Sequence, residues 1–242
     1  MPQDFALHAP LCIDDRFRKD LDDARASAHL LLFTERSMHY ILGIMLLVLC
    51  SGPGFSQSSV PDLMMNLKAG GHVIIFRHGA TDESQKDLYP FKFDDMSAQR
   101  QLSEKGRDTA RQIGEALSVR GIPIGLVYAS RLNRAVETAK LIGRKAVLPG
   151  DPLTDSGAGS PSSMANPTGM NTRAGKALRD FASAPPPAGT NNILVTHKTN
   201  IADAFGKEYS DIGEGWAIVL HIEEGNATVV KRVSPQEWTA SR

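Results

Sequence analysis

Short apolar runs, each followed by a polar or turn-forming segment, recur along residues 57–242. The runs at 71–76, 124–129 and 192–196 are rich in β-branched residues and predict buried strands. Between them, apolar residues return every three or four positions over 103–120, 130–142 and 174–182, which is typical of amphipathic helices. Two later runs, at 217–222 and 227–233, flank a Gly-containing turn and predict a hairpin.

This alternation of strands and helices predicts one α/β domain. We expect a three-layer α/β/α sandwich, in which helices cover both faces of a mainly parallel central sheet. The segments 80–100 and 149–172 are polar or rich in Gly, Pro and Ser, and they read as long loops. Ser103 and Ser130 stand where helix N-caps are expected.

The first 56 residues differ from the rest of the chain. Residues 41–49 form an apolar run that is shorter than the roughly 20 residues a membrane-spanning helix needs, but it suits the apolar part of a secretory signal. Small and turn-forming residues follow, and Gly54 and Ser56 fit a cleavage site after Ser56. We therefore expect a signal peptide over 38–56, an upstream extension over 1–37 and a folded domain over 57–242. A buried helix at 41–49 and an amphipathic helix at 11–33 remain alternatives.

Composition narrows the class of function. Lys and Arg number 27, as do Asp and Glu, so the net charge is zero and gives no electrostatic reason to expect a nucleic-acid partner. The two cysteines, Cys12 and Cys50, both precede the predicted domain. The domain is therefore without a thiolate nucleophile, a thiolate metal ligand or a disulfide framework.

Chemically capable side chains follow the predicted strands. Arg77 and His78 come directly after the first strand, and His197 follows the third. The second strand leads into a helix that carries Arg131 and Arg134. Ligands of open α/β sheets bind beyond the carboxyl ends of the strands, so these groups are expected to converge. Histidines and arginines without a carboxylate cluster suit a phosphate better than a metal ion, so no metal is expected. The sequence also shows no P-loop or Gly-rich dinucleotide fingerprint that would indicate an organic cofactor.

Four segments together resemble the histidine phosphatase superfamily, which is also called phosphoglycerate-mutase-like. They are FRHGATD at 76–82, QLSEKGRDTARQIGEAL at 101–117, YASRLNRAVETAKLI at 128–142 and LVTHKTNI at 194–201. The resemblance implies the phosphoglycerate-mutase-like fold and a phosphohistidine formed on His78. It also implies that Arg77, Arg134 and His197 bind the phosphoryl group and that Thr81 touches it. The family's pattern does not assign this role to Arg131.

The proton donor departs from the family's patterns. Lys198 stands where the acid-phosphatase branch has an aspartate directly after the second histidine. In the loop from which the mutase branch takes a glutamate, this chain offers Asp151 and Asp155. We predict Asp155 as the donor, with Glu214 as the second candidate.

These features predict an exported phosphomonoester hydrolase in the periplasm or outside the cell. The runs DDMSAQRQLSEKG and GTNNILVTHKTNIADAFG are similar to a bacterial subgroup that includes a lipopolysaccharide-core heptose phosphatase. The expected partner is a small phosphorylated substrate, with sugar phosphates and lipopolysaccharide-core phosphates as candidates, and no integral membrane domain is expected after signal removal. The alternatives are a non-catalytic phosphate-ester binding protein and a phosphoglycerate-mutase-type phosphotransferase.

Overall fold

The computed structural model describes residues 59–154 and 172–240. The predicted extension (1–37), the predicted signal peptide (38–56) and the candidate donor Asp155 lie outside these residues. The helices of the described chain are α2 (Val60–Ala69), α3 (Glu104–Val119), α4 (Asn133–Gly143), α6 (Thr172–Ala182), α7 (Lys198–Phe205) and α8 (Pro235–Thr239), with short 3₁₀ turns η1 (Met96–Ala98), η2 (Asp151–Leu153) and η3 (Lys207–Tyr209).

One six-stranded sheet runs through the described residues in the order β3-β2-β4-β1-β5-β6. Its strands are β1 (His72–Arg77), β2 (Ile124–Ala129), β3 (Leu148–Pro149), β4 (Asn191–Thr196), β5 (Ala217–Glu223) and β6 (Asn226–Val233). Strands β3, β2, β4 and β1 pair in parallel, whereas β5 is antiparallel to both β1 and β6. The prediction of a mainly parallel sheet that ends in a hairpin is thereby confirmed.

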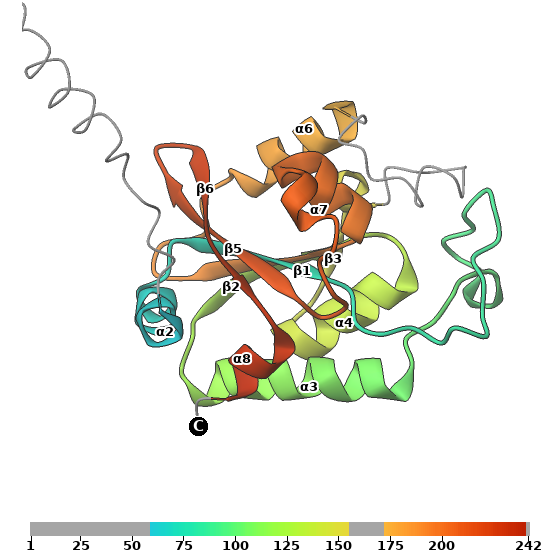
Figure 1. Ribbon diagram of the computed structural model, residues 1–242, viewed down its shortest axis with the longest axis horizontal. Helices are drawn as coiled ribbons and strands as arrows, with labels where there is room; N and C mark the ends of the chain where they lie inside the picture. Colours follow the sequence, from blue (N-terminus) through green and yellow to red (C-terminus); the bar gives the residue numbers. More distant parts are fainter. Residues whose placement is uncertain (1–58, 155–171, 241–242) are drawn as a thin grey trace, which may run out of the picture. The chain divides into compact units, whose positions relative to one another are not determined.

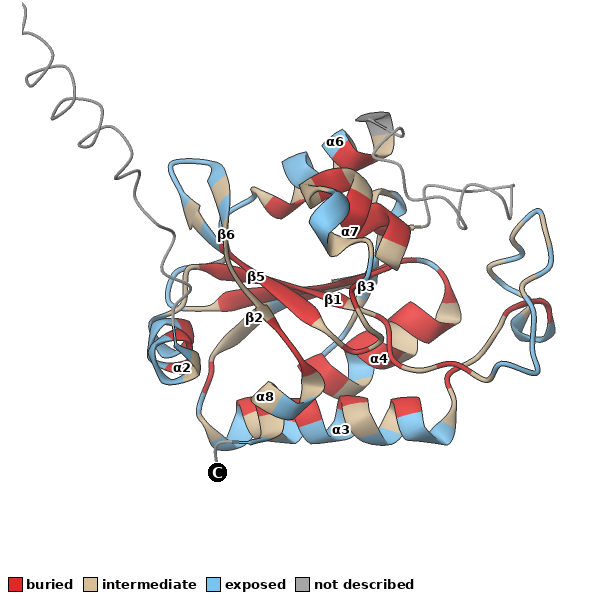
Figure 2. Cartoon of the chain, in the orientation of Figure 1, coloured by how far each residue is buried: buried red, intermediate tan, exposed pale blue. Residues whose placement is uncertain are grey.

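Helices cover both faces of this sheet, as predicted (Figure 1). Alternate residues of β1 divide between two cores: Ile74 and Phe76 pack with side chains of α2, α3, α4 and α8, whereas Val73 and Ile75 pack with those of α6 and α7. The strands of the sheet centre are accordingly buried along most of their length (Figure 2). A strand that is buried on both faces cannot alternate polar and apolar residues, which explains the unbroken apolar runs in the sequence.

The structure adds elements that the sequence pattern did not predict. Helix α8 is one turn, yet Trp238 is fully buried and its ring lies 5.8 Å from that of Phe76. A capping box fixes its start, because the Ser234 side chain accepts from the Glu237 backbone while the Glu237 carboxylate accepts from that of Ser234. Five residues are too few to show helical periodicity in the sequence. Only the capping residues, Ser234 and Glu237, could have predicted this helix.

One helix start differs from the prediction. Ser103 caps α3 as expected, since its hydroxyl accepts from the backbone N–H of Gly106. Ser130, in contrast, does not cap α4: the N-cap is Leu132, which makes no side-chain capping bond. Ser130 is fully buried and its hydroxyl lies against His197 instead.

Candidate active site

Two histidines meet where the central parallel strands end. Arg77 pairs with Thr196 in the parallel register of β1 and β4, so His78 and His197 leave neighbouring strands at the same level. Their ring centroids lie 5.3 Å apart with the ring planes at 57°. Both side chains are buried, each with 3% of its surface exposed. Strand pairing therefore brings together the two histidines that the sequence placed at strand ends.

A backbone hydrogen bond orients the imidazole of His78. Its Nδ1 lies 2.8 Å from the carbonyl oxygen of Gly79. Because a carbonyl oxygen can only accept, the contact assigns the proton to Nδ1 and leaves the lone pair on Nε2. Nε2 is thus the ring atom that can act as a nucleophile.

Helix α4 holds the segment that carries His78 in place through hydrogen bonds. The hydroxyl of Thr138 accepts from the N–H of Gly79 at 3.0 Å and donates to the carbonyl of Arg134 at 2.7 Å. One threonine of α4 therefore ties the segment that carries His78 to the helix turn that carries Arg134.

A second brace joins the same segment to α3. The N–H of Ser103 donates to the Ala80 carbonyl at 2.9 Å, and Thr81 forms a β-bridge with Leu102. A Cβ on Gly106 would overlap the Ala80 backbone, so this approach requires glycine at the first turn of α3. The bridge and the Ser103 bond close the base of the loop between them, and we call this arrangement the loop clasp.

His197 is held from the neighbouring strand. Its Nε2 lies 2.8 Å from the hydroxyl of Ser130, which directly follows β2. The same hydroxyl accepts from the N–H of Leu132 at 3.2 Å. Ser130 thereby links the second histidine to the start of α4, a role that the sequence pattern did not predict.

Each of the two predicted arginines has its own carboxylate. Arg77 Nη2 lies 3.3 Å from Glu214 Oε1, and Arg77 Nη1 donates to the Ile212 carbonyl at 2.7 Å. Arg134 Nη1 lies 2.9 Å from Asp87 Oδ1, with almost no exposure of either side chain. Both guanidinium groups are therefore held in fixed orientations.

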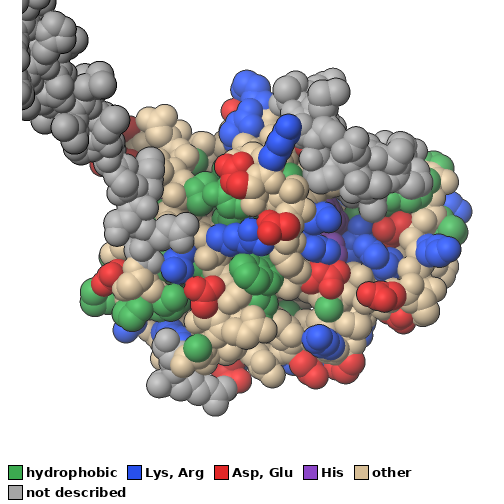
Figure 3. All heavy atoms as spheres, in the orientation of Figure 1, with side chains coloured by type: hydrophobic (Ala, Val, Ile, Leu, Met, Phe, Trp, Pro, Cys, Tyr) green, Lys and Arg blue, Asp and Glu red, His purple; other side chains and the backbone are tan. Residues whose placement is uncertain are grey.

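A hollow of about 190 Å³ opens over these groups. Lys and Arg side chains gather around a histidine on the face seen in Figure 3. The hollow is lined by Arg77, His78, Arg100, Arg134, His197, Lys198 and Thr199. The sequence indicated four of these residues; Arg100 was missed because it lies in a loop without periodicity, and Lys198 was noticed only as a departure from the family's pattern.

The electrostatic setting keeps both imidazoles neutral. Burial, followed by the charges of Arg134 and Arg77, holds the pKa of His78 well below its ordinary value of 6.5. The hydrogen bond to Gly79 acts in the opposite direction but is outweighed. Burial and the charge of Arg134 likewise hold the pKa of His197 well below 6.5. A neutral His78 keeps the lone pair that nucleophilic attack on phosphorus requires.

Three further residues that the sequence indicated, Thr81, Asp151 and Glu214, are not among the lining residues of this hollow. The hydroxyl of Thr81 is 3.5 Å from Glu214 Oε1, and Thr81 is not among the lining residues. Asp151 is largely exposed and pairs with Arg131, whose guanidinium covers the ring of Phe93 at 4.0 Å. Of the two leading donor candidates, only Glu214 falls among the described residues, and it contacts Arg77.

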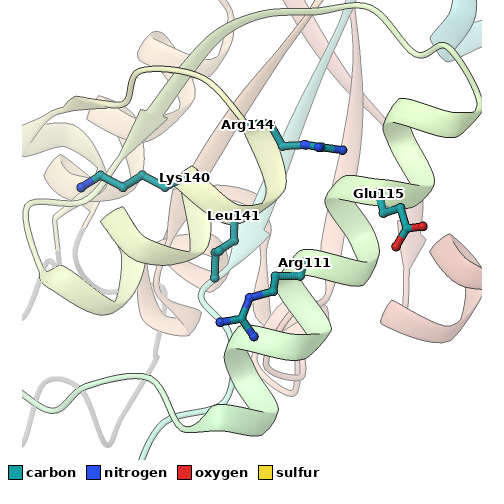
Figure 4. A pocket seen from close by; sticks show the side chains of 5 residues that line it. All are labelled: Arg111, Glu115, Lys140, Leu141 and Arg144. Atoms are coloured by element: carbon teal, nitrogen blue, oxygen red, sulfur yellow. The ribbon is translucent and has the colours of Figure 1, made fainter.

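A larger hollow, of about 370 Å³, lies between α3 and α4. It is lined by Arg111, Glu115, Lys140, Leu141 and Arg144, whose charged groups point in different directions (Figure 4). A site needs polar groups that converge on one ligand, and these do not. We therefore place the candidate active site at the smaller hollow.

Sequence comparison agrees with this assignment. The family model described as "Histidine phosphatase superfamily (branch 1)" matches residues 73–156, which include Arg77, His78 and Arg134. This match supports a histidine phosphatase superfamily domain over residues 73–156.

Individual relatives of this histidine phosphatase domain match over shorter stretches. A phosphoglycerate mutase of Candida albicans is 32% identical over 69 residues, which cover 28% of this chain and 26% of the mutase. A 2,3-bisphosphoglycerate-dependent phosphoglycerate mutase of Parvibaculum lavamentivorans is 30% identical over 70 residues, covering 29% of this chain and 31% of that protein. The chain thus matches less than a third of the length of these curated relatives.

Solved structures are similar over a longer span. The protein histidine phosphatase SixA complexed with tungstate aligns with a TM-score of 0.45 at 20% identity. That alignment covers 68% of this chain and 97% of the SixA chain.

Two further findings concern the described part of the histidine phosphatase domain. No three His, Cys, Asp or Glu side chains of residues 59–154 and 172–240 form a group that could hold a metal ion. No helix in the same ranges has both the length and the hydropathy that crossing a membrane requires.

Proposed function

We propose that this histidine phosphatase domain hydrolyses phosphomonoesters through a phosphohistidine on His78. The observation that carries the proposal is the pair of neutral, buried histidines beneath a cationic hollow. The Gly79 bond leaves Nε2 of His78 as the nucleophilic atom. The guanidinium groups of Arg77 and Arg134 match the planar, forked hydrogen bonding that phosphate oxygens accept.

In the first step, Nε2 of His78 attacks phosphorus in line with the ester oxygen. The P–N bond forms, the P–O ester bond breaks, and the leaving alcohol oxygen takes a proton from an acid of the domain. Arg77, Arg134 and His197 stabilise the charge that redistributes over the three non-bridging oxygens. The acid is Asp155 or Glu214.

In the second step, a water molecule attacks the phosphohistidine. The P–N bond breaks, inorganic phosphate forms and leaves, and the proton lost by the water returns to the group that protonated the alcohol. His78 is then neutral again with its lone pair on Nε2. No metal or organic cofactor takes part in the proposed cycle.

The proposed substrate is a small phosphorylated compound. A hollow of about 190 Å³ accommodates a phosphoryl group and a small part of the alcohol that carries it. Sugar phosphates and lipopolysaccharide-core phosphates are the candidates that accord with the proposed export of the protein. Export itself rests on the apolar run at 41–49 and the cleavage site proposed after Ser56.

A phosphoglycerate-mutase-type phosphotransferase is the second candidate function. It is favoured by the names of the two curated relatives, both of which are mutases. The two reactions share the phosphohistidine and differ in its fate: a hydrolase gives the phosphoryl group to water, whereas a mutase gives it to a substrate hydroxyl.

Trapping the intermediate tests the proposal. Full-length protein is mixed with a radiolabelled aryl phosphate, quenched in alkaline denaturant and digested for mass spectrometry. We expect label on the peptide that contains His78, together with release of inorganic phosphate. A protein that binds phosphate but neither labels nor releases it would be the non-catalytic alternative. Conversion of 3-phosphoglycerate to its isomer without net release of phosphate would identify the mutase.

A further inference from the structure

The charges of Arg77 and Arg134 are locally compensated. Glu214 lies 3.3 Å from Arg77 and Asp87 lies 2.9 Å from Arg134. Each arginine with its carboxylate is close to neutral as a pair. Such pairs still direct N–H groups toward a phosphate, but they add little net charge to its site.

Two other cations line the same hollow without such compensation. Within residues 59–154 and 172–240, no carboxylate lies within ion-pair distance of Arg100 or Lys198. The Nε of Arg100 is buried and has no hydrogen-bond partner there, a feature that it shares with the Nε of Arg77. A buried donor without a partner costs about 1–3 kcal/mol, so a ligand that accepts its hydrogen bond would recover that cost.

The backbone around Arg100 is fixed in place. Its own N–H donates to Asp87 Oδ1 at 2.9 Å, the oxygen that also faces Arg134. On one side, Gln99 accepts from the backbone N–H of Asn133 at 2.8 Å. On the other side, the side-chain oxygen of Gln101 accepts from the amide of Asn133. Arg100 is therefore presented to the hollow from a segment anchored on α4.

Lys198 occupies an electrostatically unfavourable position. It is the first residue of α7, where the helix dipole disfavours a cation. Its neighbour His197 is an active-site histidine, and Lys198 itself lines the hollow. A cation kept at this end of a helix and directed toward a shared cavity indicates a role in binding an anion.

A charge count separates the roles of the four cations. A phosphomonoester carries about 1.5 to 2 negative charges at pH 7. His78 and His197 are neutral in the free protein, and the two arginine–carboxylate pairs nearly cancel. Asp211, whose pKa is lowered by Arg232 and to a smaller extent by Lys198, is already paired with Arg232 at 2.7 Å. The charge left to balance the substrate is therefore that of Arg100 and Lys198.

We propose that Arg100 and Lys198 supply the net positive charge that binds the dianionic phosphoryl group, while Arg77 and Arg134 direct its orientation. This inference rests on the proposed function, since it assigns new residues to the same site. It makes the site selective for dianionic phosphomonoesters over singly charged phosphodiesters, because one negative charge gains less from two uncompensated cations.

The test measures binding of inorganic phosphate to the full-length protein by calorimetry at low and high NaCl. Arg100→Gln and Lys198→Gln should each weaken binding about tenfold or more, which is the range expected for a lost charge-assisted hydrogen bond. The dependence of affinity on salt should become shallower in both variants. Arg111→Gln is the matched control, because Arg111 pairs with Glu104 and Asp108 and lines the other hollow, between α3 and α4.

Arg100→Lys separates charge from shape, and we expect it to keep the salt dependence and most of the affinity. If it is as defective as Arg100→Gln, net charge is not what Arg100 supplies and the inference is overturned. Phosphate affinities within twofold of wild type in Arg100→Gln and Lys198→Gln overturn it as well. Failure of the wild-type protein to bind phosphate overturns the proposed function and this inference together.

Discussion

Asp87 Oδ1 lies 2.9 Å from Arg134 Nη1, in an ion pair whose side chains are 4% and 1% exposed. The loop that carries Asp87 thus reaches into the domain and holds the arginine of α4. The same carboxylate oxygen accepts from the backbone N–H of Arg100. One carboxylate therefore holds the guanidinium of Arg134 and the backbone of Arg100, two residues that line the candidate site.

We predict that Asp87→Asn lowers both stability and phosphate affinity. Removing one charge of a buried pair costs about 3–5 kcal/mol, because the other charge stays buried. Urea denaturation measures the stability change, and the KM for an aryl phosphate reports the loss of Arg134 orientation. The control is Asp151→Asn, since the Asp151–Arg131 pair is exposed and such pairs contribute about 0–1 kcal/mol. Equal effects of the two substitutions would contradict the positioning role of Asp87.

The nucleophile prediction concerns His78. We expect His78→Ala to abolish turnover while circular dichroism shows an unchanged fold. Among the described residues that line the hollow, His197 is the only other imidazole, and it faces Ser130. His221→Gln is the control, since His221 lies exposed on β5. Near-normal turnover by His78→Ala would exclude the proposed mechanism.

We also expect turnover to continue in EDTA, because nucleophile and anion-binding groups are all side chains of the domain. The measurement is the initial rate of aryl phosphate hydrolysis before and after dialysis against the chelator. A loss of activity that an added metal ion restores would contradict this expectation.

The proton donor can be identified by comparing leaving groups. An alkoxide needs a proton to depart, whereas an acidic phenolate departs without one. We predict that Asp155→Asn slows hydrolysis of an alkyl phosphate far more than that of an aryl phosphate. Glu214→Gln should affect both substrates equally, because the structure places this carboxylate on Arg77. The reverse pattern would assign the donor role to Glu214.

The pH dependence follows from the two neutral histidines. Their pKa values are well below 6.5 in the folded protein, whereas those of the unfolded chain are about 6.5. Between these values the unfolded chain binds more protons, so the free energy of unfolding falls as the pH drops below about 6.5 and is unaffected by these groups above it. Imidazole NMR signals of His78 and His197 should show no titration between pH 7.5 and 6. A midpoint near 6.5 would contradict the proposed neutral state.

The processing prediction concerns the N-terminus. We expect protein isolated from its native host to begin near Gln57, with residues 1–56 absent. Intact-mass spectrometry of the periplasmic or secreted fraction measures this directly. A cytoplasmic protein that begins at Met1 would contradict export and strengthen the mutase alternative.

The sequence predicted which side chains meet at the strand ends, because strand ends are local features. An apolar run followed by Arg77-His78 or by His197 indicates that each side chain stands at the end of a strand. Parallel pairing of β1 and β4 then brings these side chains together. Partners from distant segments were not predictable in this way. Asp87 and Arg100 lie in a loop without periodicity, and their positions depend on contacts with α4 that only the folded chain reveals.

Ser130 shows the converse limit. A serine before a helical pattern favours an N-cap, but a buried histidine needed its hydroxyl and the helix begins later. The hydrogen bond between Ser130 and the buried His197 therefore outweighed the preference of serine for a helix N-cap, which is worth about 1 kcal/mol. Thr138 lies within the quoted segment 128–142, and only the structure shows that its hydroxyl holds the backbone of Gly79.

The loop clasp has a consequence for how such a domain can diversify. Its bonds, between Thr81 and Leu102 and between Ala80 and Ser103, join both ends of the intervening loop beside the histidines. The entropy cost of closing a longer loop grows only slowly with its length. The part of this loop between Asp87 and Arg100 can therefore change in length at little entropic cost, provided that Asp87 still holds Arg134 and Arg100 still lines the hollow.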